Sequence, residues 1–222
     1  MPKMPKKLPA NGYEEIFGDP RWDTERGIRS NNCYSYAMGD YLPYRRNKAV
    51  VGDLAGYDHD IRYDSCEPLK KRILKDNPRR IYEEQPEVPC KDGFYKIMMF
   101  VSTQTKNGRD YGDFHFYKQH RDVVYTVQPG DTIESIASFF GISQKIVRDA
   151  LQGSSTLKAG QELYLKGANV FSHKLGWATG ALLKDSCGKR IDDPRKACRA
   201  YGLTYDAYCG SYCVRAHRTK TS

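Results

Sequence analysis

The chain has 222 residues, of which 39% are hydrophobic, 12% aromatic and 28% charged, a composition that can bury one large core or two small ones. No run of about 18 apolar residues occurs, which excludes a transmembrane helix, and the amino terminus lacks the apolar core of a secretory signal, so ordinary export is not expected. The formal net charge is +9, but the basic residues are scattered without a nucleic-acid motif, so we expect a solvated basic face and no specific nucleic-acid ligand.

The first predicted helix begins at Cys33, after a basic, proline-rich arm at residues 1–29. Asn31 and Asn32 are helix-capping residue types, and the residues after them, through Met38, predict a short helix. Cys33 would then lie at the positive end of the helix dipole, where a thiolate is stabilised and becomes a nucleophile. The alternative is a small apolar core residue, because free cysteine is among the most buried residue types.

The next predicted elements form a sheet. Residues 41–92 are rich in Pro, Gly, Asp and Tyr, and only a helix near Pro68–Lys75 is predicted among them. The apolar run 93–102 predicts the central strand of the sheet, and residues 205–214 predict an edge strand. A helix followed by an antiparallel sheet places the chain in the α+β class.

Residues 123–167 change character and predict a compact module. A strand with alternating apolar residues opens the segment, two short helices follow, and the strand Glu162–Leu165 closes it. The helix signals are a cap at Asp131 or Thr132 and a stop at Gly141 for the first helix, and a cap at Ser143 for the second.

The flanks of this module predict one hairpin. Phe114–Tyr117 and Val170–His173 both favour strands, and only a short turn would join them if residues 123–167 were removed. We therefore predict that the module is inserted at the hairpin tip, where neighbouring loop ends tolerate an added domain. The resulting division is an arm (1–29), a host domain in two parts (30–122 and 168–216), the inserted module (123–167) and a tail (217–222).

Seven cysteines are present, so at least one cannot pair within the chain. Six of them could form up to three disulfides and leave Cys33 free; these are Cys66, Cys90, Cys187, Cys198, Cys209 and Cys213. Seven reduced thiols in a reducing compartment fit equally well. A zinc site has only the spacing of Cys209 and Cys213 in its favour.

The inserted module resembles a LysM domain. The match is carried by Tyr125–Val127, Pro129–Ile133, Ile136–Ala137, Phe140–Ser143 and Leu157–Leu163. The resemblance implies binding of N-acetylglucosamine polymers, peptidoglycan or chitin, in a groove between two loops. The implied contact residues are Gly130, Asp131, Thr132 and Ile133, with residues 153–157 opposite. Leu151 replaces an asparagine that is usual in the family.

The host domain resembles a family of bacterial and viral proteins that are similar to papain-like peptidases and amidases of the NlpC and CHAP kind. The match is carried by Asn32–Ala37, Asp113–Tyr117, Ser172–Gly176, Asp185–Gly188, Ile191–Pro194 and Tyr208–Val214. The resemblance implies a papain-like fold. In that fold a thiol at a helix start attacks an amide, a histidine on a facing strand acts as base, and a third polar group orients the imidazole.

The resemblance assigns the site residues. Cys33 is the candidate nucleophile and His115 the candidate base, so folding is expected to bring the sulfur beside the imidazole. His173 is the first choice as orienting group and Asp185 the second. Backbone N–H groups at the Cys33 helix start, helped by Asn32, are the candidate oxyanion donors.

No cofactor and no metal site are predicted. His115 and His173 could bind a metal across the hairpin, but no local carboxylate pair completes such a site. His59, His120 and His217 are predicted to be surface histidines.

Three functions are compatible with these features. The first is a cysteine peptidase or amidase whose LysM module holds peptidoglycan or a chitin-like polymer; without a signal peptide, it would be carried by a virus or phage particle or act after lysis. The second is a catalytically silent structural component of a virion, docking on other assembly proteins. The third is an intracellular processing protease. The expected location is virion-associated or intracellular, with delivery to the cell wall.

Overall fold

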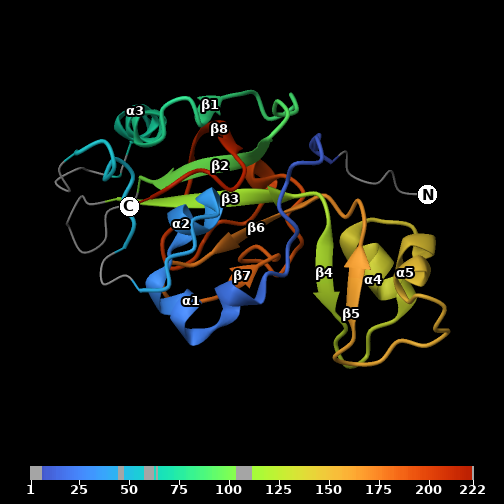
Figure 1. Cartoon of the computed structure of the whole chain (residues 1–222). Coiled ribbons are helices and arrows are strands. Elements are labelled where there is room, and N and C mark those ends of the chain that lie inside the picture. The colour runs from blue at the N-terminus through green and yellow to red at the C-terminus, as the bar shows by residue number, and fades with distance from the viewer. Residues whose placement is uncertain (1–6, 45–47, 58–62, 64, 104–111, 222) are drawn as a thin grey trace.

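The computed structural model describes residues 7–44, 48–57, 63, 65–103 and 112–221. A six-stranded antiparallel sheet of order β1-β8-β2-β3-β6-β7 forms its centre, and β4 and β5 form a second sheet (Figure 1). The strands are β1 (Ile81–Glu83), β2 (Phe94–Ser102), β3 (Asp113–His120), β4 (Val123–Thr126), β5 (Glu162–Leu165), β6 (Val170–Lys174), β7 (Ala181–Leu182) and β8 (Ala207–Arg215). The helices are η1 (Pro20–Asp23), α1 (Glu25–Ser30), α2 (Cys33–Met38), α3 (Cys66–Asp76), α4 (Ile133–Phe140), α5 (Gln144–Ala150) and η2 (Pro194–Lys196).

Helix α2 begins at Cys33, as predicted, because Asn32 caps it. The Asn32 Oδ1 accepts hydrogen bonds from the Tyr34 and Ser35 N–H groups, and the Ser35 hydroxyl completes a capping box. Gly39 ends the helix in the left-handed conformation, at φ 66°. All six residues of the helix are buried, so it is a core element.

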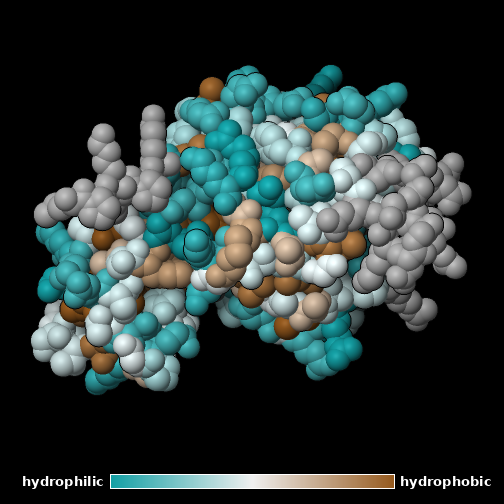
Figure 2. All heavy atoms as spheres, turned by 180° about the vertical axis from the view of Figure 1, so that it is seen from behind, coloured by the Kyte–Doolittle hydropathy of each residue, from teal (hydrophilic) through white to brown (hydrophobic). Residues whose placement is uncertain are grey.

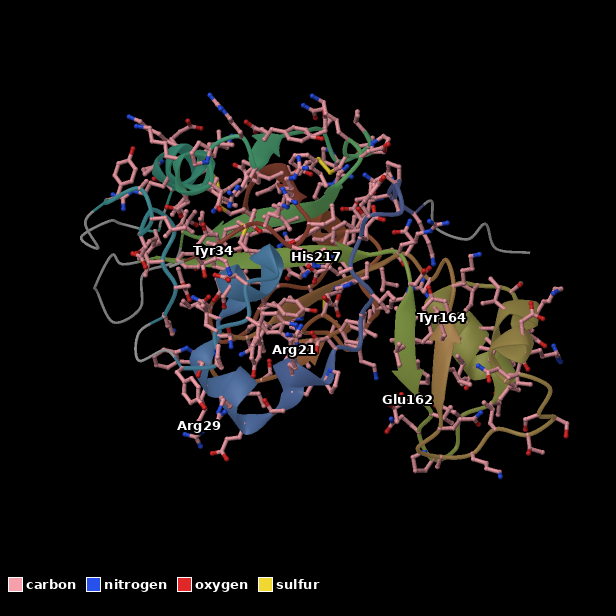
Figure 3. All side chains as sticks on the ribbon, viewed as in Figure 1. Arg21, Arg29, Tyr34, Glu162, Tyr164 and His217 are labelled. Carbon is pink, nitrogen blue, oxygen red and sulfur yellow. A yellow bond between two sulfur atoms is a disulfide. The ribbon has the colours of Figure 1, made fainter. Side chains whose placement is uncertain are left out.

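The two faces of β3 belong to different cores. Phe114 and Phe116 pack with α2, and the Tyr34 ring, labelled in Figure 3, lies 5.2 Å from the Phe116 ring. Tyr117 points to the other face, into a cluster that contains Tyr205. Because side chains alternate along a strand, His115 shares the Tyr117 face and lies opposite α2.

Parts of the host sheet differ from the prediction. β2 is central, as predicted, but β8 is not an edge strand, because it pairs with β1 on one side and β2 on the other. β1 and β7 were not predicted. The predicted arm folds from residue 7 onward: Trp22 is buried and stacks edge-on against Tyr36. Residues 1–6 lie outside the described part of the chain.

The predicted hairpin is present. β3 pairs antiparallel with β6, with Tyr117 opposite His173, and the chain between these strands folds into β4, α4, α5 and β5. Thr132 caps α4, Gly141 ends it and Ser143 precedes α5, as the residue types indicated. In the space-filling view the module forms a lobe, set off from the rest by a notch on one side (Figure 2).

Three disulfides are formed and Cys33 remains a free, buried thiol. The pairs are Cys66–Cys209, Cys90–Cys213 and Cys187–Cys198. This outcome agrees with the disulfide alternative and leaves no thiol for a Cys209–Cys213 zinc site. Within the described residues, no helix is long and apolar enough to cross a membrane.

Candidate functional site

A cavity of about 1030 Å³ opens where β3 begins. Both Cys33 and His115 line it, although about eighty residues of chain separate them. β6 pairs with β3 only from Tyr117 onward, so among the described residues no strand pairs with the edge of β3 at Phe114 and Phe116 on that side. The remaining lining comes from Asn32, Lys48, Ala49, Val50, Tyr63, Gly112, Asp113, Phe114, Leu175, Gly176, Trp177, Ala178, Tyr201, Leu203 and Tyr205.

The Cys33 sulfur lies beside the open edge of β3. Its thiol donates to the Phe114 carbonyl at 3.6 Å. Burial, followed by the nearby Asp113 carboxylate, raises the pKa of Cys33 to about 12, against the opposing effects of the Phe116 N–H, Lys48 and Lys174. The resting group is therefore a thiol, although it lies at a helix start.

His115 and His173 are joined by a hydrogen bond whose direction follows from their other partners. The His115 Nε2 lies 2.9 Å from the His173 Nδ1, and the His173 Nε2 lies 3.0 Å from the Lys184 carbonyl. Because a carbonyl only accepts, His173 carries its proton on Nε2 and accepts on Nδ1. The His115 proton is then on Nε2. Its Nδ1 is left as an unprotonated acceptor with no hydrogen-bond partner among the described residues.

Both imidazoles are neutral at pH 7. Burial lowers the pKa of His115 well below its usual value, and the neighbouring His173 lowers it further. Burial also lowers the pKa of His173 to about 4, against the opposing effects of the Lys184 carbonyl and Asp185. A neutral His115 with a free Nδ1 has the form that a general base requires.

Cys33 and His115 approach the cavity from different sides of the sheet. The Cys33 sulfur belongs to the α2 core, whereas the His115 ring contacts Tyr117, Tyr201 and Tyr205 on the other face, with centroids 4.9–5.4 Å away. The open edge of β3 is where the two sides meet. Among the described residues, the hydrogen bonds of Cys33 and His115 go to other partners, so the predicted contact between the sulfur and the imidazole stays a prediction.

Tyrosines that the sequence analysis missed enclose the imidazoles. Tyr201 stacks on His173 at 4.9 Å and its hydroxyl lies 3.4 Å from the His173 Nε2. The Tyr205 hydroxyl donates to Asp113 at 3.0 Å. Tyr201 lies in a segment without helix or strand periodicity, and Tyr205 begins the predicted strand 205–214, so only their residue type could have drawn notice.

Two other predicted site residues serve the fold. The Asn32 side-chain amide donates to the Ala49 carbonyl at 2.7 Å while its oxygen caps α2, so this side chain fixes the helix start, and its help to an oxyanion stays a prediction. The Asp185 carboxylate accepts backbone N–H groups of Cys187, Lys189 and Cys198. Asp185 therefore organises its own loop, and His173 is the group that contacts His115.

A metal between the two histidines is incompatible with the geometry, because their nitrogens are hydrogen-bonded directly. In the described part of the chain, Asp185, Cys187 and Cys198 form the one group of three possible metal ligands, and a disulfide joins both of its sulfurs.

One of the histidines that were predicted to lie at the surface is buried instead. His217 is exposed, whereas His120 is buried and bonds to the Ser172 hydroxyl at 2.6 Å and to the Glu15 carbonyl at 2.7 Å. Burial lowers the pKa of His120 to about 3. His59 lies outside the described residues.

Buried lysines near the site were also missed. Lys174 is fully buried, and its Nζ donates to the carbonyls of Ile28 and Gly176. Burial lowers the pKa of Lys174 to about 8. At the cavity mouth, the exposed Lys48 amine lies 5.5 Å from the Trp177 ring centroid.

Two of the four predicted glycan-contact residues, Asp131 and Thr132, use their side chains in hydrogen bonds within the module. The Asp131 carboxylate accepts from the Tyr125 hydroxyl and the Gln128 N–H, both at 2.7 Å. The Thr132 hydroxyl accepts from the Ser135 N–H at 3.0 Å. The loop therefore offers a ligand its backbone and the surfaces of Gly130 and Ile133. Strand β5 alternates between buried and exposed residues, and its exposed Glu162 and Tyr164 are labelled in Figure 3.

The elements of this segment follow the order strand-helix-helix-strand. Residues 125–166 match the LysM domain. LysM domains bind carbohydrate, so this part of the chain supports binding of N-acetylglucosamine-containing glycans such as peptidoglycan or chitin. No curated protein and no solved structure matches the chain. Leu151, at the position of the usual asparagine, is buried in the LysM core.

Replacing Thr132 by alanine is expected to lower the free energy of unfolding by about 1 kcal/mol, because the cap bond to Ser135 is lost. Chemical denaturation measures the change. Ser143→Ala is the matched control, since the Ser143 side chain makes no cap bond to α5. Equal losses in both variants would contradict the capping assignment.

Proposed function

We propose that this chain is a glycan-targeted cysteine hydrolase, with the LysM domain holding an N-acetylglucosamine polymer while Cys33 cleaves an amide. One observation carries the proposal: the buried helix-start thiol and an imidazole directed by a second imidazole line the same cavity. Papain-like peptidases and amidases of the NlpC and CHAP kind use a helix-start thiol and an oriented imidazole in direct contact; the shared cavity supports this proposal, and the contact between Cys33 and His115 is what the proposal adds.

The chemistry uses His115 as the base. As Cys33 attacks, its thiol proton passes to the His115 Nδ1 and a sulfur–carbon bond forms. The amine leaves with that proton when the carbon–nitrogen bond breaks. His115 then takes a proton from the water that attacks the thioester and returns it to the Cys33 sulfur as the carbon–sulfur bond breaks. His173 keeps the His115 proton on Nε2 throughout. The Cys33 N–H, which has no acceptor within the described residues, is the candidate oxyanion donor.

A second candidate is a catalytically silent scaffold that binds glycan through its LysM domain. The raised pKa of Cys33 favours it, because a buried thiol at neutral pH is a weak nucleophile.

The two candidates are separated by amide cleavage. The purified protein is incubated with cross-linked peptidoglycan and newly released amino groups are counted, with Cys33→Ala as control. A hydrolase releases amines only with Cys33 present. Glycan binding without amine release in either protein would establish the scaffold.

Alkylation of Cys33 by iodoacetamide is expected to be slow at neutral pH and to rise about tenfold per pH unit as the thiolate fraction grows toward its pKa of about 12. Mass spectrometry follows a single site, because the six other cysteines are paired. A rate that is constant from about pH 6 to about pH 8 would show a preformed thiolate–imidazolium pair, contrary to the neutral resting state.

A further inference from the structure

One of the three disulfides lies at the surface, beside the histidine pair. Cys187 is exposed and Cys198 is half-buried. Each of the other two bridges places one sulfur in the core, because Cys209 and Cys213 of β8 are fully buried. A thiol reductant has to reach a sulfur directly in order to attack it. The Cys187–Cys198 bridge is therefore the one that a reductant reaches most readily while the chain stays folded.

The segment that follows this bridge covers both imidazoles of the candidate site. We call residues 199–205 the tyrosine cover. Within it, Tyr201 stacks on His173 with ring centroids 4.9 Å apart, and Tyr205 lies 4.9 Å from the His115 ring. Both tyrosines also line the cavity. Burial lowers the pKa of each imidazole, and the two tyrosine rings supply part of that burial.

The disulfide anchors the start of the tyrosine cover. The end of the cover runs into β8, whereas its start follows Cys198, which the bridge joins to the loop at Cys187. That loop is attached to the central sheet, because Ile191 pairs with Phe171 of β6. Between Ile191 and β8, the bridge is the one covalent tie that connects the chain to this loop.

The hydrogen bonds that accompany the bridge are few. The Asp185 carboxylate accepts from the Cys198 N–H at 2.9 Å, and the Ser186 N–H donates to the Cys198 carbonyl at 3.2 Å. The Ala200 N–H donates to the Ser186 hydroxyl at 3.2 Å. Ser186 and Ala200 are exposed, so water competes for their bonds. Without the disulfide, these bonds alone hold the start of the cover.

We propose that the Cys187–Cys198 bridge is a site of reversible thiol–disulfide exchange, at which a thiol reductant releases the tyrosine cover from the imidazoles. A thiolate of the reductant attacks the Cys187 sulfur, and Cys198 leaves as a thiolate that takes up a proton. A second thiol attacks the mixed disulfide, so the reductant ends as a disulfide and Cys187 as a thiol. Two electrons and two protons pass to the bridge. An oxidised thiol of the same class reverses the step.

Release of the cover changes the surroundings of both imidazoles. Water reaches the rings, so the pKa of His173 is expected to rise from about 4 toward its ordinary value of about 6.5. The effect on catalysis rests on the proposed function. Tyr201 no longer fixes the His173 ring, although the Lys184 carbonyl still accepts its proton. Amide cleavage is therefore expected to fall about tenfold, less than on removal of His173.

A titration of the folded whole chain with dithiothreitol tests the site. EDTA is present throughout, because Asp185 and the two bridged sulfurs lie within 4.8 Å of one another and thiolates bind zinc. Free thiols are labelled with iodoacetamide and located by mass spectrometry. Cys187 and Cys198 are expected to be labelled at a dithiol concentration that leaves the other two bridges intact. Earlier labelling of a β8 cysteine, or labelling of all six together, would refute the assignment.

Two further readouts test the consequence: an NMR titration of the His173 imidazole, and amine release from cross-linked peptidoglycan. The double variant Cys187→Ser, Cys198→Ser should match the reduced protein in both and should not respond to dithiothreitol. Reoxidation of the reduced protein should restore both values. Thermal denaturation confirms that the variant is folded.

The outcomes separate the exchange site from the hydrolase. An equal pKa of His173 in the oxidised and reduced protein would refute release of the cover. A raised pKa with equal amine release in both states would refute the effect on catalysis. A raised pKa without amine release in any state would refute the hydrolase and uphold the exchange site.

Discussion

Amide cleavage is expected to fall to background in Cys33→Ala and by about three orders of magnitude in His115→Ala. The first variant removes the nucleophile, and the second removes the acceptor of its proton. Amine release from cross-linked peptidoglycan at fixed protein concentration measures both losses. Unchanged turnover in His115→Ala would refute the proposed general base, even if Cys33 proved essential.

His173 acts through His115, so its variants should separate orientation from chemistry. His173→Ala deprives the His115 Nε2–H of its acceptor, and we expect a loss of about a hundredfold. His173→Gln can present an oxygen to the same proton and should recover part of that loss. His217→Ala, at an exposed histidine, is the matched control and should be neutral. A merely structural role for His173 would give no such rescue.

Removing two of the disulfides together is expected to unfold the chain. Cys66–Cys209 and Cys90–Cys213 are separated by 143 and 123 residues and both hold β8. Their loops overlap, so each bridge shortens the loop that the other closes. Chain entropy then gives a loss of about 3–4 kcal/mol for one bridge and about 8–9 kcal/mol for both, which is comparable to the total stability of a domain.

Denaturant unfolding of alanine variants measures these losses. The single-bridge variants should retain a cooperative transition at lower denaturant, and the variant lacking both bridges should have none. Replacing Cys187 and Cys198, which are separated by only 11 residues, is the short-loop control, with an expected loss of about 3 kcal/mol. Near-native stability without both long-range bridges would show that the hydrophobic core alone maintains the sheet.

The LysM segment was predicted almost residue by residue, because its signals are local. A cap, a stop and a periodic apolar face lie within a few positions of one another, as at Thr132 and Gly141. The hairpin prediction succeeded for a related reason: Phe114–Tyr117 and Val170–His173 both carry strong strand propensity next to a compact insert. β8 was misplaced because sheet order depends on which strands meet in space, and its short partner β1 gives no period of its own.

The burial and protonation states of titratable side chains were the least predictable features. Lys174 and His120 belong to residue types that are mostly exposed or partly exposed, yet both are buried with their polar atoms bonded. The burial of each side chain depends on a hydrogen bond to a carbonyl or hydroxyl group from a distant segment of the chain. The neutral state of Cys33 has the same origin: the helix start favours a thiolate, but burial under the sheet outweighs it.

The sequence by itself determined the LysM fold, the strands of the hairpin, the helix that starts at Cys33 and the chemical types at the candidate site. Tertiary structure alone decided which cysteines pair, that His173 rather than Asp185 contacts His115, and that the cavity opens at the start of β3 while the LysM segment follows its end. The reason is physical: capping, periodicity and strand propensity act over a few residues, whereas disulfide pairing, burial and the distance between two sites depend on contacts between segments far apart in the chain.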